Sequence, residues 1–106
     1  MFFNTTPSVS VQEAHKSTQK QGTVFIDVRT AGEYASGHAE GARSMPLDLL
    51  DAKDVAELAR QDAVYVICRS GGRSAAAVEA LRQAGVNAIN VSGGTLAWQG
   101  EGLPMR

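Results

Sequence analysis

The sequence contains little sulfur and has no excess of either charge. Its 106 residues include a single cysteine, and the formal net charge is −1 at pH 7. One cysteine cannot form an intrachain disulfide, so nothing in the sequence requires an oxidising compartment. Without a basic excess, the chain is not expected to bind nucleic acid or an anionic membrane surface.

Long apolar segments are also missing. The first ten residues, MFFNTTPSVS, lack the basic start and the sustained apolar run of a signal peptide. No stretch approaches the ~18 consecutive apolar residues of a membrane span, and we find no repeats, low-complexity segments or linkers. A composition of 43% hydrophobic and 20% charged residues is typical of a soluble globular protein. The sequence therefore predicts one cytoplasmic domain over residues 1–106.

Short apolar runs alternate with helix-like segments along the chain. The runs TVFIDV (23–28), AVYVIC (63–68) and NAINV (87–91) are rich in β-branched residues and predict buried strands, the second of them central. Shorter edge strands are expected around Val9 and over 43–45. Strands that alternate with helices are typical of an α/β fold with a parallel sheet and right-handed crossovers.

Helix boundaries are marked by capping residues. Two helices should begin with a capping box, in which a Ser or Thr is followed three residues later by Glu: Ser10 with Glu13, and Thr30 with Glu33. A continuous helix is expected over 47–60, after Pro46. The segment 74–84 predicts a helix that buries Ala77, Val78, Leu81 and Ala84 and is ended by Gly85.

Polar and reactive residues gather where the predicted strands end. Because ligands bind at the carboxyl ends of parallel strands, these residues should share one edge of the sheet. They are Asp27 and Arg29, then Cys68, then Ser92, Gly93 and Gly94.

The lone cysteine stands between a buried strand and a helix start, in the stretch CRSGGRS. Free backbone N–H groups at a helix N-terminus favour anions, and Gly71 and Gly72 allow successive N–H groups to converge on one point. Arg69 and Arg73 add positive charge, and the sequence between Asp62 and Glu79 holds no carboxylate. Such surroundings lower a cysteine pKa to about 3.5–7.5, from about 8.5. The stretch predicts a nucleophilic thiolate beside a bound anion.

A structural interpretation competes with this one. A lone cysteine at a strand end is often a small buried hydrophobe, and SGGRS could be a plain turn before a helix. The absence of a second cysteine argues against a two-thiol reductase. His15 and His38 lack the spacing of a metal site or of a cysteine–histidine pair, so we expect no metal and no cofactor.

Three segments together resemble the signatures of the rhodanese (sulfurtransferase) family. They are IDVRTAGEYASGHAEGARSMP, VICRSGGRSAAAVEALRQAG and INVSGGTLAWQGEGLP, and they cover nearly the whole chain in the right order. The resemblance implies a three-layer sandwich with a five-stranded parallel sheet flanked by helices. It also implies that the Cys68 thiolate takes sulfur from a donor such as thiosulfate, leaving a persulfide.

The resemblance assigns roles around the cysteine as well. The backbone N–H groups of the loop would hold the terminal sulfur of the persulfide, and both arginines would orient the sulfonate of the donor. The residues concerned are Arg69, Ser70, Gly71, Gly72, Arg73 and Ser74. The other signature residues are expected to be structural, namely Asp27, Arg29, Glu33, His38, Gly93, Gly94 and Trp98, with Glu33 as the partner of Arg29.

Loop length and charge separate this chain from relatives of the same fold. Four residues lie between Cys68 and Arg73, whereas related phosphatases and arsenate reductases place five there. The two arginines favour thiosulfate over mercaptopyruvate, whose enzymes carry an uncharged loop. Ala39 and Ser44 depart from the family pattern, which puts local packing in doubt and leaves the chemistry untouched.

Three functions remain open besides thiosulfate sulfurtransferase. The first is a persulfide carrier fed by a partner protein, the second a phosphatase or arsenate reductase, and the third a silent binding module. The expected acceptors of sulfur are cyanide, a small thiol, or a thioredoxin-like or other sulfur-accepting protein.

Overall fold

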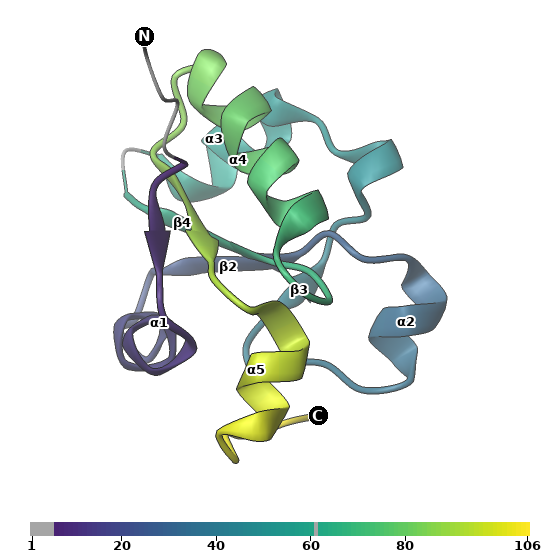
Figure 1. Ribbon diagram of the computed structural model, residues 1–106. Helices are drawn as coiled ribbons and strands as arrows, with labels where there is room; N and C mark the ends of the chain where they lie inside the picture. Colours follow the sequence, from purple (N-terminus) through teal and green to yellow (C-terminus); the bar gives the residue numbers. More distant parts are fainter. Residues whose placement is uncertain (1–5, 61) are drawn as a thin grey trace, which may run out of the picture.

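The computed structural model describes residues 6–60 and 62–106, which form a parallel sheet with helices on both faces (Figure 1). The five strands lie in the order β1-β5-β4-β2-β3. Their bounds are β1 Ser8–Val9, β2 Val24–Asp27, β3 Arg43–Ser44, β4 Val64–Ile67 and β5 Ala88–Val91. This arrangement confirms the predicted α/β fold, with β4 at the centre of the sheet.

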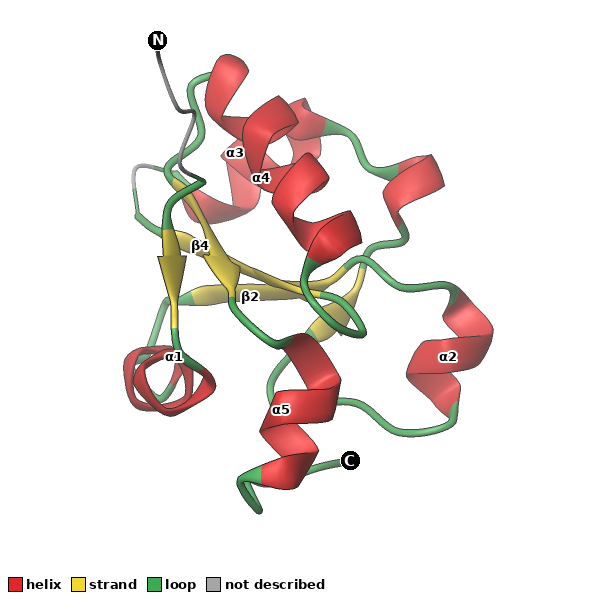
Figure 2. Cartoon of the chain, viewed as in Figure 1, coloured by secondary structure: helices red, strands yellow, loops and turns green. Residues whose placement is uncertain are grey.

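Two layers of helices cover the sheet (Figure 2). Helices α3 (Ala52–Ala59) and α4 (Gly72–Gln83) pack on one face, against the side chains of alternate residues of β2 and β4. Helices α1 (Val11–Thr18) and α5 (Gly94–Gly100) cover the other face. The short helix α2 (Ala31–Ala35) buries no residue of its own. Because strand side chains alternate between faces, the continuous apolar runs of β2 and β4 fill both cores.

The segment 47–60 does not form the continuous helix that its apolar spacing predicts. It is divided into a short 3₁₀ helix η1 (Leu47–Leu49) and helix α3, with Leu50 in an extended conformation between them. Asp51 accepts a hydrogen bond from the Lys53 N–H at 2.8 Å and so caps a new helix start. The capping tendency of aspartate therefore outweighs the helical spacing of the leucines.

The other helix boundaries agree closely with the sequence. Thr30 and Glu33 form a complete capping box, whereas the Ser10 hydroxyl accepts the Glu13 N–H and so supplies one half of the predicted box. Helix α4 begins two residues earlier than predicted. Its last predicted core residue, Ala84, is exposed because it lies at the C-cap, just before the left-handed Gly85. No helix of the described residues has the length and apolar character to cross a lipid bilayer.

Candidate active site

Cys68 directly follows the central strand β4, so it stands at the carboxyl end of the sheet. Its side chain lies on the same face as Val66, two residues earlier, and belongs to the core cluster under α4. The residue is 1% exposed. The thiol therefore has apolar neighbours on the core side and the β4–α4 loop on the other side.

The loop after Cys68 turns back over the sulfur. Gly71 has a φ of 116°, in the left-handed region that favours glycine, and it immediately precedes α4. This turn aims the Gly71 N–H at the Cys68 Sγ atom, at 3.1 Å. The Ser74 hydroxyl, in the first turn of α4, lies 3.2 Å from the same sulfur. The predicted convergence of donors on the thiol is present.

Two opposing effects set the acidity of this thiol. Burial raises the pKa of Cys68, because a charged sulfur loses contact with water. Hydrogen bonds from the Ser74 hydroxyl lower the pKa, and so do the backbone N–H groups of Ser74, Gly71 and Ser70. The lowering effects prevail, and the pKa of Cys68 falls below its ordinary value. The loop therefore favours the ionised sulfur more than water does, and none of the hydrogen bonds responsible comes from a histidine.

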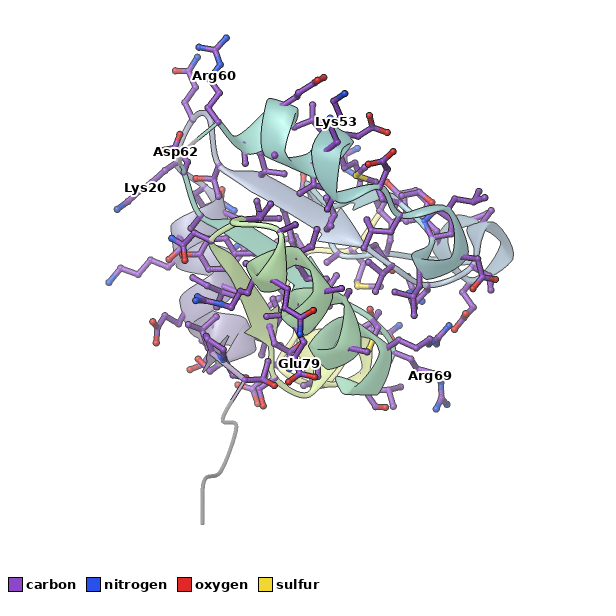
Figure 3. The ribbon with its side chains drawn as sticks, turned by 90° about the horizontal axis from the view of Figure 1, so that it is seen from above. Lys20, Lys53, Arg60, Asp62, Arg69 and Glu79 are labelled. Atoms are coloured by element: carbon purple, nitrogen blue, oxygen red, sulfur yellow. The ribbon has the colours of Figure 1, made fainter. Side chains whose placement is uncertain are left out.

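The two arginines of the loop have different surroundings. The Arg73 guanidinium donates to both carboxylate oxygens of Glu33, at 2.7 and 2.9 Å. The carboxylate raises the pKa of Arg73, and the guanidinium together with the Thr30 N–H lowers the pKa of Glu33 to about 2. Arg69 has an exposed side chain that extends away from the ribbon in Figure 3, and it makes no side-chain hydrogen bond to the described residues.

The predicted pairing of Glu33 with Arg29 is wrong. Arg29 instead donates to the buried carboxylate of Asp27, with its closest contact at 2.8 Å, and to the Gly37 carbonyl, also at 2.8 Å. Asp27 ends β2 only two residues before Arg29, so the two groups meet within one strand end. Glu33 instead forms its ion pair with Arg73, at the start of α4. The expected structural role of Asp27 and Arg29 fits their burial, at 0% and 6% exposure.

The first residues of α5 donate hydrogen bonds to the backbone carbonyls of Cys68 and Arg69. The Thr95 N–H and hydroxyl both donate to the Cys68 carbonyl, at 2.8 and 2.9 Å. The Leu96 N–H donates to the Arg69 carbonyl at 3.1 Å. Gly94 lies so close that a Cβ atom there would be 2.5 Å from the Arg69 carbonyl oxygen. Glycine is therefore required at position 94 for this close approach.

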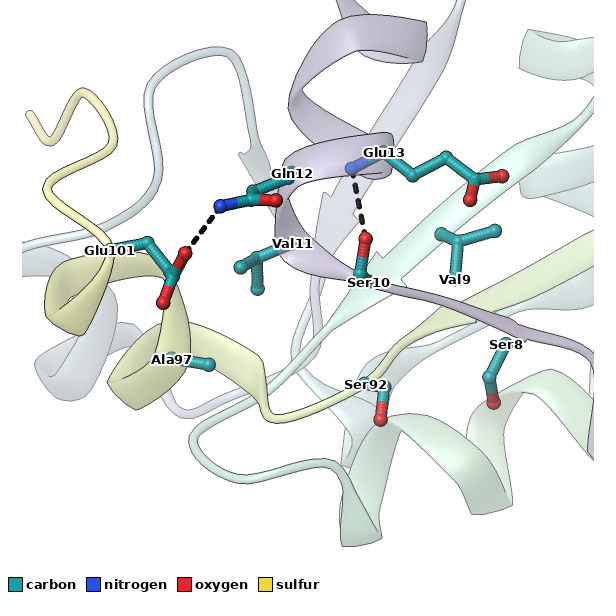
Figure 4. Close-up of a pocket in the computed structure, with 9 residues that line it drawn as sticks. All are labelled: Ser8, Val9, Ser10, Val11, Gln12, Glu13, Ser92, Ala97 and Glu101. Carbon is teal, nitrogen blue, oxygen red and sulfur yellow. Dashed lines mark hydrogen bonds between the residues drawn. The ribbon is translucent and has the colours of Figure 1, made fainter.

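Two hollows near the carboxyl edge of the sheet differ in charge. One, of about 210 Å³, lies beside the loop, and its charged lining residues are Arg29, Arg69 and Glu33. The other, of about 580 Å³, lies between β1, the start of α1 and α5 (Figure 4). Its lining includes Glu13, Glu101 and Ser92 and contains no cationic side chain. Arg69 is the cation of the smaller hollow that no described carboxylate binds, since Arg29 is paired with Asp27. Ser92, which the sequence places at the same edge of the sheet as Cys68, lines the larger hollow.

The remaining signature residues serve packing. The His38 ring stacks on Tyr34, with ring centroids 3.6 Å apart, and its Nδ1 lies 2.8 Å from the Tyr34 carbonyl. Trp98 is fully buried and donates from Nε1 to the Pro104 carbonyl at 2.7 Å. Ala39 is fully buried, whereas Ser44 is exposed on the edge strand β3. Within the described residues, no cluster of histidine, cysteine or carboxylate side chains could hold a metal ion.

Sequence reasoning missed one polar residue at this site. Asn90 is buried on β5, and its Oδ1 lies 2.5 Å from the Ser74 hydroxyl oxygen. It pairs with Val66 of β4, so its side chain points to the same face of the sheet as Cys68. An amide inside an otherwise apolar strand was the signal in the sequence, because a buried polar group needs a partner.

Comparison with known proteins agrees with this geometry. Residues 10–101 match the family described as Rhodanese-like domain. A sulfurtransferase from Allochromatium vinosum is 34% identical over 86 residues, covering 80% of this chain and 79% of that protein. The chloroplastic thiosulfate sulfurtransferase 16 from Arabidopsis thaliana is 34% identical over 111 residues, covering 93% of this chain and 92% of that protein. These names support a role in sulfur transfer.

Solved structures point the same way. The crystal structure of a rhodanese-related protein from Thermoplasma volcanium has a TM-score of 0.82 and 32% identity, covering 94% of this chain and 97% of that one. Some relatives are longer, and the chain spans 56% of an uncharacterised protein from Synechocystis that is 32% identical to it. The chain belongs to the rhodanese-like family.

Proposed function

We propose that this protein is a thiosulfate sulfurtransferase that works through a persulfide on Cys68. One observation carries the proposal: the Cys68 sulfur is buried, yet it accepts a hydrogen bond from the Gly71 N–H and has the Ser74 hydroxyl within hydrogen-bond distance, at 3.2 Å. Such donors stabilise a negative charge on sulfur. They would serve both the attacking thiolate and the persulfide anion that it becomes.

The first half-reaction needs no oxidant. The Cys68 thiolate attacks the outer sulfur of thiosulfate and forms a new S–S bond to it. The bond between that outer sulfur and the sulfonate sulfur breaks, its electron pair leaves with sulfite, and the enzyme retains a persulfide anion. Because the total charge is the same before and after the transfer, no proton is required. A pocket of fixed donors suits this chemistry, since it holds the negative charge at every stage.

In this proposal Arg69 is the main residue that binds and orients the sulfonate group of the donor. Its guanidinium is exposed beside the hollow of about 210 Å³ and is not engaged by a described carboxylate, whereas Arg73 is held by Glu33. A planar guanidinium can give two parallel hydrogen bonds to one sulfonate group. Arg73 would contribute to donor binding to the extent that thiosulfate competes with Glu33 for it.

The second half-reaction returns Cys68 to its starting state. Cyanide or a thiolate attacks the terminal sulfur of the persulfide, and the Cys68 thiolate leaves. With no second cysteine in the chain, the acceptor must come from outside, as a small thiol or as a thioredoxin-like or other sulfur-accepting protein. A cytoplasmic setting, which the sequence predicts, would keep the thiol reduced between turnovers.

The test is a two-step experiment on the whole chain. Incubation with thiosulfate alone should add the mass of one sulfur atom and release one equivalent of sulfite. Cyanide should then remove that mass and yield thiocyanate. The Cys68→Ser variant should do neither. Absence of the adduct in the native chain, or its persistence in the variant, contradicts the proposal.

The same assay separates the other functions. Loading by mercaptopyruvate but not by thiosulfate would reassign the donor. An adduct that forms only from a persulfidated partner protein would make the chain a carrier. Release of phosphate from an aryl phosphate, dependent on Cys68, would favour a phosphatase.

A matched pair of variants tests the role of Arg69. Arg69→Gln should raise the KM for thiosulfate several-fold and leave the alkylation of Cys68 by neutral iodoacetamide unchanged. Arg60→Gln removes the same charge at the far end of the molecule (Figure 3) and should change neither. An equal loss of both reactions in Arg69→Gln would show that Arg69 sets thiol reactivity and does not bind the donor.

A further inference from the structure

The Ser74 hydroxyl has one hydrogen and three acceptors within reach. The Cys68 sulfur and the Gly71 carbonyl each lie 3.2 Å from its oxygen, and the Asn90 Oδ1 lies 2.5 Å away. A hydroxyl donates one hydrogen at a time and can accept others. The side chain of Asn90 therefore competes directly with the sulfur for the hydrogen of Ser74.

The position of Asn90 follows from the sheet. On β5 it pairs in register with Val66, two residues before Cys68 on the neighbouring strand β4. Side chains two residues apart on a strand share a face, so Asn90, Val66 and Cys68 all point toward α4. Ser74 lies in the first turn of α4 above them and is fully buried, while Asn90 is 7% exposed. Water has little access to this contact.

The two ends of the Asn90 amide have opposite effects on Ser74. When the carbonyl oxygen faces the hydroxyl, as in this structure, it competes with the sulfur for the hydroxyl hydrogen, and it can take that hydrogen while the sulfur is a neutral thiol. The neutral thiol can then donate its own S–H to the Ser74 oxygen. When the NH₂ group faces the hydroxyl, it donates to the Ser74 oxygen and leaves the hydrogen free for an ionised sulfur.

We propose that Asn90 is a positioning residue for the nucleophile: its amide directs the Ser74 hydrogen toward the Cys68 sulfur when that sulfur is charged and away from it when it is neutral. The role needs an amide, because it uses both a donor and an acceptor at one position. It rests on the proposed role of Cys68 as nucleophile. Its test uses no sulfur donor, so a failure here can be told apart from a failure of sulfur transfer.

The test is a double-mutant cycle read by the pH dependence of Cys68 alkylation with iodoacetamide. Asn90→Asp keeps the shape of the side chain, but its carboxylate only accepts, so it should hold the Ser74 hydrogen and raise the apparent pKa of Cys68. We expect a shift of about one unit or more, which slows alkylation about tenfold below the pKa. The new charge also acts on the sulfur directly, and that part should remain when Ser74 is replaced by alanine.

The prediction is therefore a difference between two backgrounds. The shift caused by Asn90→Asp should be clearly larger in the native chain than in Ser74→Ala. Equal shifts in the two backgrounds, or no shift in either, would overturn the proposal. Asn87→Asp adds the same charge at an exposed position just before β5 and should leave the profile unchanged.

A second measurement uses the native chain and so does not depend on the folding of Asn90→Asp. The side-chain ¹⁵N resonance of Asn90 should titrate with the same apparent pKa as Cys68, because the amide responds to the charge on sulfur. In Ser74→Ala this response should be lost. A resonance that does not move in the native chain, or that moves equally in Ser74→Ala, contradicts the proposed coupling.

Discussion

Replacement of Gly94 by alanine should destabilise the fold strongly, because this glycine lies against the backbone of the cysteine loop. A Cβ atom there would stand 2.5 Å from the Arg69 carbonyl oxygen and 2.6 Å from the Cys68 carbonyl oxygen. Both neighbours are backbone atoms, and they are held by hydrogen bonds from Thr95 and Leu96. The overlap cannot be relieved by rotation of a side chain.

Two costs combine at this position. The φ of Gly94 is 61°, and a left-handed conformation costs a residue with a Cβ atom roughly 1–2 kcal/mol. Overpacking of a tight site typically costs about 1–3 kcal/mol more. For a domain of this size each kcal/mol lowers the melting temperature by roughly 4–8 °C, so we expect a fall of about 10 °C or more.

Thermal unfolding followed by circular dichroism measures the effect, and Gly100→Ala is the matched control in the same helix. A Cβ atom on Gly100 would meet no other atom within 4 Å, and the φ of Gly100 is not positive. Alanine there should leave the melting temperature unchanged or raise it slightly, since alanine favours a helix by up to about 1 kcal/mol. A Gly94→Ala variant that melts with the native chain would refute the reasoning.

Three further variants test other contacts. Glu33→Gln removes the carboxylate that Arg73 binds. In the native chain the pKa of Glu33 is lowered from 4.5 to about 2. The Glu33 carboxylate therefore stabilises the fold fully above pH 4.5, and this stabilisation is lost as the pH falls toward 2. The difference in melting temperature between this variant and the native chain should therefore be largest near neutral pH and shrink steadily in acid, and a constant difference contradicts the ion pair. Asp27→Asn leaves the Arg29 guanidinium buried without a carboxylate and should cost about 3–5 kcal/mol in urea unfolding, whereas a loss below about 1 kcal/mol would show that the pair contributes little. Trp98→Phe loses the indole hydrogen bond and part of the core volume and should cost about 1–3 kcal/mol without changing the alkylation rate of Cys68, and a changed rate would contradict its structural role.

The central strand and the cysteine loop could be predicted because their signals are local. The run 63–68 is apolar without interruption, and the residues that turn the chain over the sulfur follow it directly. Of the two glycines expected to have a positive φ, Gly71 has one, whereas Gly72 does not and is the first residue of α4. Each of these features depends on residues within a few positions of one another, so the spacing in the sequence is enough to place them.

The partners across the site could not be predicted in the same way. Glu33 is 40 positions from Arg73 in the sequence, and their contact depends on how α2 sits against the start of α4. No carboxylate is close to Arg73 in the sequence, yet the fold brings the Glu33 carboxylate into contact with it. The contact of Ser74 with Asn90 likewise depends on the register between β4 and β5, which the apolar pattern of the strands does not specify.

Titration of the Cys68 thiol tests the central claim most directly. The thiolate absorbs in the far ultraviolet, and the Cys68→Ala variant supplies the blank for the rest of the chain. If the Ser74 hydroxyl and the loop N–H groups outweigh burial, the titration should show a pKa below the free value of about 8.5. A pKa at or above that value would show that burial prevails, and that the loop does not hold an ionised sulfur.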